Sequence, residues 1–288
     1  MEASLQPFSI YISQVGVPDL HVRASGKDEP LCLLIHGFGE GAFVWNEFAP
    51  LVAPYCRTLA VDLRGHGDSD WDPDGHYDIH THVADLSRVI VSFGIQPLVL
   101  IGHSMGGDLA IRLAVMQSAR VIGSVIVDYN PDIDSEISTH VRTDFNSESC
   151  IYQSTKEYIA EIIRKRPLAS PLMLERIARE ALKSIGDNRM ILRRDPAMGY
   201  QDAADADGVL DRKAQWNIFK RSEWPKLLVR GVGSAVLPQR VAHQMSANLR
   251  NGQLQVVQCA GHAVMSDNPG GFANAVMPFV RTLLGSHP

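Results

Sequence analysis

The sequence predicts an α/β fold: a mostly parallel central sheet flanked by helices, with an inserted helical lid. Short apolar runs typical of buried strands alternate with amphipathic helical patterns before residue 130 and again after residue 220. Between Asp128 and Trp224 this alternation stops, over a segment too long for a structureless loop. We therefore expect a core domain in two parts, residues 1–134 and 221–288, and a lid insertion of residues 135–220.

The first part of the predicted sheet opens with a hairpin, because residues 8–26 alternate between apolar and polar. Two short apolar runs, LCLLI at 31–35 and RTLAV at 57–61, then predict buried strands. The pattern THVADLSRVIVSFG predicts a helix over 81–94, with Val83, Leu86, Ile90 and Phe93 on one face. PLVLIGHSMGG, residues 97–107, predicts a strand, a tight turn and the start of a helix.

The second part of the sheet is expected from three further apolar runs. VIGSVIVD at 121–128 and PKLLVRG at 225–231 predict buried strands, and LQVVQCAGHA at 254–263 predicts the last strand. An amphipathic helix should follow, over Phe272–Leu284. Within the lid, helical patterns cover Lys156–Arg166 and Pro171–Ile185.

Composition narrows the class of protein. The chain has 288 residues, 45% of them hydrophobic, and a formal net charge of -5, which gives no basis for nucleic-acid binding. No apolar run reaches the roughly 18 to 20 residues that span a bilayer, so we expect no membrane partner and a cytoplasmic location. The four cysteines have no CxxC spacing and are expected to be reduced, with Cys32 and Cys259 on core strands. A monomer or homodimer acting on a small molecule fits this composition.

The strongest chemical signal is Gly102-His103-Ser104-Met105-Gly106, a G-x-S-x-G motif directly between a buried strand and a helix. A serine there sits on a strained turn, and the two glycines let the strand and helix approach each other. Serine is a poor nucleophile at its ordinary pKa and needs a base within hydrogen-bond reach. His262, which follows the last predicted strand, is the candidate base.

A second loop can stabilise negative charge. His36-Gly37-Phe38-Gly39 follows the first parallel strand, where the backbone N–H of Phe38 can lie beside that of Met105. Two such donors aimed at one point make an oxyanion hole. We expect His36 to brace this loop rather than to transfer protons. The sequence has no clustered metal-ligand spacing and no GxGxxG after the first strand, so we expect no metal and no cofactor.

Several segments together resemble the α/β-hydrolase superfamily, and its lid-bearing esterase, lactonase and carbon–carbon hydrolase branch in particular. They are LLIHGFGEGAFVW, VDLRGHGDSD, LIGHSMGG, VDYNP, WPKLLVRG and AGHAV. The resemblance covers about 1–130 and 220–288 and is weak in the lid. It implies that Ser104 is the nucleophile and His262 the base, because serine precedes histidine along these chains. It also implies that Asp62 to Ser69 form a structural turn.

The sequence departs from the resemblance at the catalytic acid. Similar proteins usually place aspartate in the turn after the strand equivalent to LLVRG, at the position of Ala235, and a methyl group cannot accept a hydrogen bond from imidazole. Asp128, at the end of the neighbouring strand, is the remaining candidate, since a minority of the superfamily carries its acid there. Many relatives also have aspartate at this point as a helix cap or loop brace.

These residues lead to a serine hydrolase acting on a small or medium ester or lactone with an apolar portion. Two alternatives remain: acid–base chemistry by Ser104 and His262 in a lyase, decarboxylase or cyclase, and a ligand-binding protein that keeps the pocket. We expect substrate contacts from Gly37, His103, Phe145, Tyr152 and Tyr158. Candidate lid walls of the pocket are Ile137, Val141, Phe145, Tyr152, Tyr158 and Ile162.

Overall fold

The computed structural model describes residues 6–26, 29–94, 96–133, 135–149, 151–200 and 212–285. Its main sheet has eight strands in the order β1-β2-β4-β3-β5-β6-β9-β10. β1 and β2 form the predicted hairpin, β2 also runs antiparallel to β4, and the remaining neighbours are parallel. The strands are β1 (Phe8–Gln14), β2 (Val17–Gly26), β3 (Leu31–Ile35), β4 (Arg57–Val61), β5 (Leu98–His103), β6 (Val121–Val127), β9 (Lys226–Gly231) and β10 (Gly252–Val257).

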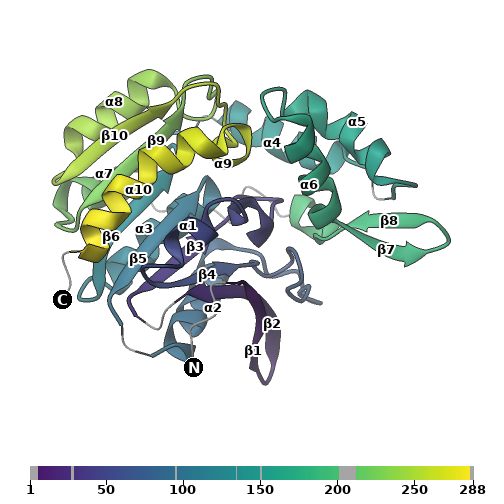
Figure 1. Ribbon diagram of the computed structural model, residues 1–288, viewed down its shortest axis with the longest axis horizontal. Coiled ribbons are helices and arrows are strands. Elements are labelled where there is room, and N and C mark those ends of the chain that lie inside the picture. Colours follow the sequence, from purple (N-terminus) through teal and green to yellow (C-terminus); the bar gives the residue numbers. More distant parts are fainter. Residues whose placement is uncertain are drawn as a thin grey trace.

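Helices cover both faces of this sheet, as the alternating pattern predicts (Figure 1). One face is packed by α2 (Ile79–Ser92), α3 (Met105–Met116), α7 (Arg212–Arg221) and α8 (Gln239–Asn248). The other is packed by the short helices η1 (Ala42–Trp45), α1 (Ala49–Val52) and α9 (Val264–Asp267), and by α10 (Pro269–Gly285). Each central strand divides its side chains between the two layers: Leu33 and Ile35 of β3 face the first, and Cys32 and Leu34 face the second.

Helix starts are set by short polar side chains. Asp78 caps α2 by accepting the backbone N–H of Thr81. In the same way, Ser154 and Ser170 cap α5 (Thr155–Lys165) and α6 (Pro171–Ala181), and Pro171 occupies the first turn of α6. The sequence pattern located both lid helices within a few residues.

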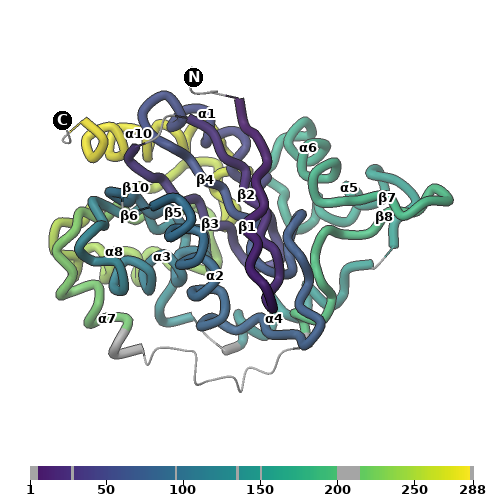
Figure 2. Tube along the Cα trace, turned by 90° about the horizontal axis from the view of Figure 1, so that it is seen from below, coloured from purple at the N-terminus to yellow at the C-terminus, as the bar shows by residue number. Residues whose placement is uncertain are grey.

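Most elements of the segment predicted to be a lid lie to one side of the sheet: α5, α6 and the hairpin that follows them are on the right of Figures 1 and 2, while α4 (Ser135–Ser147) lies nearer the middle. The hairpin strands are β7 (Leu182–Gly186) and β8 (Arg189–Leu192), and the short helix η2 (Pro196–Tyr200) follows them. The expectation of a helix as far as Ile185 was wrong, because β7 and β8 pair as an antiparallel hairpin. Asp187 and Asn188 both have positive φ in its turn, the conformation that suits a tight hairpin.

Helix α7 differs from the rest of the predicted 135–220 insertion. It packs against α8, and its Phe219 is buried in the main core on that face of the sheet. The part of the insertion that lies beside the sheet therefore comprises residues 135–200. Residues 201–211 lie outside the part of the chain that the structure describes.

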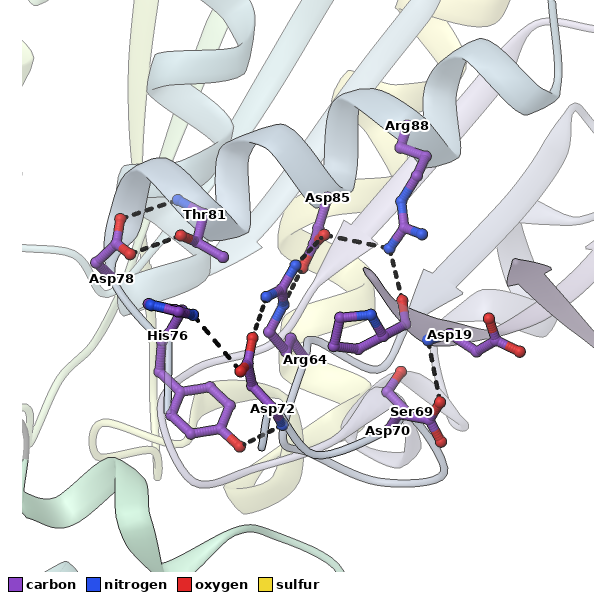
Figure 3. A network of polar contacts seen from close by, with 12 residues as sticks. Asp19, Arg64, Ser69, Asp70, Asp72, His76, Asp78, Thr81, Asp85 and Arg88 are labelled. Atoms are coloured by element: carbon purple, nitrogen blue, oxygen red, sulfur yellow. Dashed lines mark hydrogen bonds and ion pairs between the residues drawn. The ribbon is translucent and has the colours of Figure 1, made fainter. Parts of the chain in front are cut away.

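A polar network holds the loop between β4 and α2 against α2 (Figure 3). Arg64 pairs with Asp72 from the loop and with Asp85 from α2, and Asp85 also receives a hydrogen bond from Arg88. Asp62, at the start of the loop, accepts hydrogen bonds from the backbone of Ala42 and the ring of His21. The charged residues of this turn are thus used in structural contacts, as the sequence predicts.

The cysteine expectation held for one position and failed for another. Cys32 is buried on β3, whereas Cys259 follows β10 in a loop and is exposed. The apolar run ends at Val257, and Cys259 adopts a positive φ incompatible with a continuing strand. Cys150 lies outside the described residues. None of the helices in the described ranges combines the length and apolar character needed to cross a bilayer.

Candidate active site

Ser104 lies on a sharp turn between β5 and α3. Its φ of 52° and ψ of -119° are unfavourable for a residue with a side chain, and such strain concentrates at functional sites. A Cβ on Gly102 would lie 2.0 Å from the Gly106 carbonyl oxygen, and one on Gly106 would lie 2.3 Å from that of Ile35. Both motif glycines are therefore required for the close approach of strand and helix.

His262 meets a carboxylate at its Nδ1 atom. Asp128 follows β6, and its Oδ2 lies 2.8 Å from His262 Nδ1, within the range expected for an orienting acid. Asp128 is fully buried, whereas the His262 side chain is about one-third exposed. Since β5, β6 and β9 are neighbours, the ends of β5 and β6 bring Ser104 and Asp128 to the same edge of the sheet, and the Ser104 N–H bonds to Val127 O at 2.9 Å.

The turn after β9 supports this acid. Ser234 is buried and its hydroxyl donates to Asp128 Oδ2 at 2.5 Å, while the Gly231 N–H donates to Oδ1 at 3.2 Å. Ala235, the residue at the position where an acid is usual, is exposed. A serine thus occupies the inward position of the turn, and the carboxylate comes from the adjacent strand.

The oxyanion loop follows β3. Three backbone N–H groups of this loop are already hydrogen-bonded within the fold. The Gly37 N–H donates to the Glu40 carboxylate and the Gly39 N–H donates to His66 Nε2. The Glu40 N–H donates to the Gly37 carbonyl. Among the described residues, the Phe38 N–H has no acceptor. Met105 is the first residue of α3, so its N–H has no acceptor within the helix. These are the two amides that the sequence assigns to an oxyanion hole.

His36 braces this loop, as expected. Its Nε2 accepts the Leu63 N–H at 3.0 Å and its Nδ1 bonds to the Gly37 carbonyl at 2.7 Å. An imidazole that accepts at one nitrogen and donates at the other is neutral. Burial lowers the pKa of His36 in agreement with this, against the raising effect of Asp62. Gly37 likewise holds the loop, because its N–H is bonded to Glu40 and not offered to a substrate.

Comparison with known proteins identifies the family of this fold and site. Residues 32–275 match the model of the alpha/beta hydrolase family, which is most of the chain. The chain belongs to the alpha/beta hydrolase family. The sequence resemblance to this superfamily is therefore confirmed.

Members of the family similar to this chain include enzymes that act on esters. An esterase of Mycobacterium tuberculosis is 27% identical over 270 residues, covering 90% of this chain and 84% of the relative. An sn-1-specific diacylglycerol lipase of Mus musculus is 26% identical over 260 residues, covering 87% and 81%. The crystal structure of E-2-(acetamidomethylene)succinate hydrolase superposes with a TM-score of 0.84 at 24% identity, covering 96% of this chain and 99% of that one.

In this alpha/beta hydrolase, the lid residues expected to contact substrate occupy two different environments. Phe145 packs against Phe38 of the oxyanion loop, with ring centroids 4.7 Å apart, and the Arg194 guanidinium lies 3.8 Å from its ring centre. Tyr152 and Tyr158 instead pack on each other inside the lid, together with Ile162. These three side chains belong to a cluster of lid residues against which Phe43 of η1 also packs, whereas Phe145 packs on the oxyanion loop.

His103 also differs from its expected role. It is buried, with Nδ1 3.0 Å from Glu40 Oε2 and Nε2 2.9 Å from the His262 carbonyl oxygen. Neither ring nitrogen is left for a substrate, so the expectation of a substrate contact is corrected to a contact with the main chain of His262. Glu40 and Ser234 were not assigned from the sequence. Glu40, in HGFGEG, lies next to the oxyanion loop, and that adjacency was the available signal.

Two groups of side chains have ligand atoms close enough to hold a metal: His21, Asp62 and Asp68, and separately Asp72, Asp74 and His76. In each group, side chains that could bind a metal already form hydrogen bonds or ion pairs within the protein. His21 bonds to Asp62 through Nδ1 and to Ser9 through Nε2, and Asp72 pairs with Arg64. Both groups belong to the brace around the β4–α2 loop, and the catalytic geometry described above does not include them.

Proposed function

We propose that this protein is a serine hydrolase of a small or medium ester or lactone with an apolar portion. The observation that supports it most directly is the pairing of Asp128 with His262 Nδ1 near the strained turn that carries Ser104: the ring of His103, which directly precedes Ser104, lies 4.7 Å from the ring of His262. The relatives named as an esterase and a lipase support the same reaction class.

The proposed reaction follows from the placement of these atoms. Ser104 Oγ attacks the acyl carbon while His262 Nε2 accepts its proton, and Asp128 stabilises the resulting imidazolium. The N–H groups of Phe38 and Met105 bind the oxyanion of the tetrahedral intermediate. His262 then returns the proton to the leaving oxygen, and water hydrolyses the acyl-enzyme by the same sequence of transfers. The hydrogen bonds that the structure gives Ser104 are those of its backbone, so its hydroxyl is not yet bonded to His262. The hydrogen bond between a nucleophile and its base commonly tightens only when substrate binds.

The apolar preference rests on the surroundings of the oxyanion loop. Phe38 joins a cluster with Tyr77, Phe145 and Met198, which brings lid side chains against the loop that would bind the acyl oxygen. An apolar substrate portion would complement such a wall. We propose a small-molecule substrate on this basis, with the protein acting as a monomer or homodimer in the cytoplasm and without a cofactor.

Lyase, decarboxylase or cyclase chemistry drew its main support from Ala235, which implies a histidine without an acid. The bond between Asp128 and His262 supports the hydrolase instead, because it gives the histidine a carboxylate partner. The binding-protein alternative is disfavoured by the strained serine and by the donors left at Phe38 and Met105, because a pocket that only binds needs neither.

Replacement of the nucleophile tests the proposal. We expect Ser104→Ala to abolish turnover of a small activated ester while leaving the fold intact, because it removes one oxygen and adds no volume. Retention of more than about a tenth of the wild-type rate would exclude covalent catalysis by this residue, since loss of a triad serine costs orders of magnitude. Circular dichroism and thermal unfolding verify the fold of the variant.

Covalent labelling separates the candidate functions. An aryl fluorophosphonate should label Ser104 of the wild type rapidly and leave Ser104→Ala unlabelled, with the adduct located by peptide mass spectrometry. Absence of labelling in folded wild-type protein would instead favour acid–base chemistry or simple binding.

A further inference from the structure

A charged set of side chains joins the lid, the oxyanion loop and the catalytic histidine. Glu40 lies at its centre and is buried. Its Oε1 accepts a hydrogen bond from Arg166 Nη2 at 2.8 Å, and Arg166 caps the C-terminus of lid helix α5. Its Oε2 accepts from His103 Nδ1 at 3.0 Å and from the Gly37 N–H at 3.1 Å. One carboxylate therefore contacts three parts of the site.

The partners of His103 determine its protonation state. His103 Nε2 faces the carbonyl oxygen of His262, which can only accept, so this nitrogen carries a proton. His103 Nδ1 faces the Glu40 carboxylate, which also accepts when ionised. With both nitrogens donating, the ring is an imidazolium paired with a carboxylate. His36 differs, because it accepts the Leu63 N–H and is neutral.

The electrostatics agree with this charge assignment. Burial lowers the pKa of His103, but the charge and hydrogen bond of Glu40 outweigh it and the pKa is raised. Burial raises the pKa of Glu40, yet His103 and Arg166 hold it well below its usual range. The other titratable groups that act on His103 are His36, Asp128 and Asp267, and the ring of His262 stacks 4.7 Å away. Both shifts favour the charged forms of His103 and Glu40, in agreement with the hydrogen-bond geometry.

We propose that His103, held as an imidazolium by Glu40, is a positioning residue that fixes the His262 loop relative to the oxyanion loop, and that Arg166 makes this arrangement depend on docking of the lid. His103 directly precedes Ser104 and anchors the main chain of His262, while Glu40 anchors Gly37. Displacing Glu40, His103 or Arg166 therefore shifts His262 and the oxyanion-hole N–H groups relative to Ser104. The kinetic consequence rests on the proposed hydrolase function; the protonation state and the anchoring do not.

The protonation state is tested without any activity. Full-length protein labelled with ¹⁵N-histidine should show, at pH 7, one ring with both nitrogens protonated that disappears in His103→Gln. In Glu40→Gln this ring should become neutral, because its counter-charge is removed. A neutral His103 ring in the wild type at pH 7 overturns the proposal whatever the enzyme catalyses.

The link to the lid is tested by hydrogen exchange and kinetics of Arg166→Met. The matched control is Arg176→Met, which removes another pairing of the lid with the body, to Glu47, at an exposed site away from His103. Arg166→Met should speed amide exchange in residues 37–40 and 261–264 and lower kcat about tenfold or more with little change in KM. Arg166→Lys should recover part of both effects, and Arg176→Met should change neither by more than about twofold.

The outcomes are distinguishable. If Arg166→Met resembles Arg176→Met in exchange, the lid link is wrong. If exchange changes as expected but wild-type Ser104 is not labelled by a fluorophosphonate, the anchoring is supported and the hydrolase function fails. Should Glu40→Gln not fold, the wild-type ring state and the Arg166 variants still decide the proposal.

Discussion

Asp128 supplies the carboxylate at His262 Nδ1 that the turn after β9 lacks at Ala235. Its carboxylate receives three donors, from His262, Ser234 and the Gly231 backbone, so that both oxygens are held. Its φ is 49°, a left-handed conformation that aspartate tolerates better than most residues with a Cβ. The local backbone conformation therefore aims the side chain toward the next strand, where His262 and Ser234 converge.

Loss of this carboxylate should abolish most activity. We expect Asp128→Asn to lower kcat for an activated ester by about 10³ to 10⁴, because the amide favours the wrong tautomer of His262. Ser234→Ala, which leaves the bond between Asp128 and His262 in place, should cost far less, within about tenfold. Steady-state kinetics of the two purified variants measure the contrast. Comparable losses in both would show that Ser234 is more than a support for the acid.

A rescue experiment tests from which position of the turn after β9, 234 or 235, an aspartate can reach His262. Ser234 is buried against Asp128 and Ala235 is exposed. In the Asp128→Asn background, Ser234→Asp should therefore restore part of the activity, and Ala235→Asp should restore less. A strong gain from Ala235→Asp in the otherwise unchanged chain would mean that Asp128 does not serve His262.

The sequence alone led to Ser104, His262 and Asp128 because each follows a recognisable strand pattern, and strand ends of a parallel sheet meet at one edge. Glu40 and Arg166 could not be paired in this way, since they are 126 positions apart and one belongs to the lid. The role of His103 was misjudged for the same reason. Its neighbour in sequence, Ser104, is the candidate nucleophile, but its ring points to partners that only the tertiary fold supplies.

At the scale of elements, the lid segment has a hydrophobic cluster of its own and is attached to the β4–α2 loop by backbone hydrogen bonds. Tyr152, Leu174 and Ile177 are buried among lid residues and not in the main core. This attachment follows β8: the Arg193 carbonyl accepts the Gly67 N–H at 2.7 Å, and the Asp195 N–H donates to the Gly65 carbonyl at 2.8 Å. The lid is thus tied to the braced β4–α2 loop at one end.

Hydrogen exchange should reveal this difference within the lid. We expect amides of α5 to exchange faster than those of β5, because β5 is buried on both faces at the centre of the sheet. The amides of Gly67 and Asp195 should be more protected than those of α5, because each donates a hydrogen bond across the contact between residues 193–195 and the β4–α2 loop. Exchange followed by mass spectrometry at peptide resolution measures all three segments. Protection of α5 equal to that of β5 would make the lid a rigid wall.

Elements with strong periodicity were predictable, and elements decided by packing were not. The helix α5 has an apolar stripe and a serine cap, and it lies within a residue of its predicted range. The β7–β8 hairpin was missed because Asp187-Asn188 lacks the glycine that usually marks such a turn. Helix α7 was placed in the lid by its position in the chain, although its Phe219 packs into the main core.

Over the whole molecule, neutral buried histidines link folding to pH. His36, His66 and His82 lie in contact around the oxyanion loop and the start of α2, with ring centroids 4.8 Å and 6.4 Å apart. Burial is the largest cause of the lowered pKa of each; that of His66 falls well below its ordinary value and that of His82 to about 4. The folded state therefore resists protonation of all three rings.

The sign of the pH effect follows from these shifts. An unfolded histidine takes up a proton near pH 6.5, whereas folded His82 does so only near pH 4, so the free energy of unfolding falls as the pH drops between these values. From pH 7 to pH 5 the contribution of His82 is about 2 kcal/mol. Urea unfolding at the two pH values should show a smaller acid loss in His82→Gln than in the wild type. The exposed His140 provides the control, and His140→Gln should keep the full wild-type dependence. An unchanged dependence in His82→Gln would show that this ring is protonated in the folded protein at pH 5.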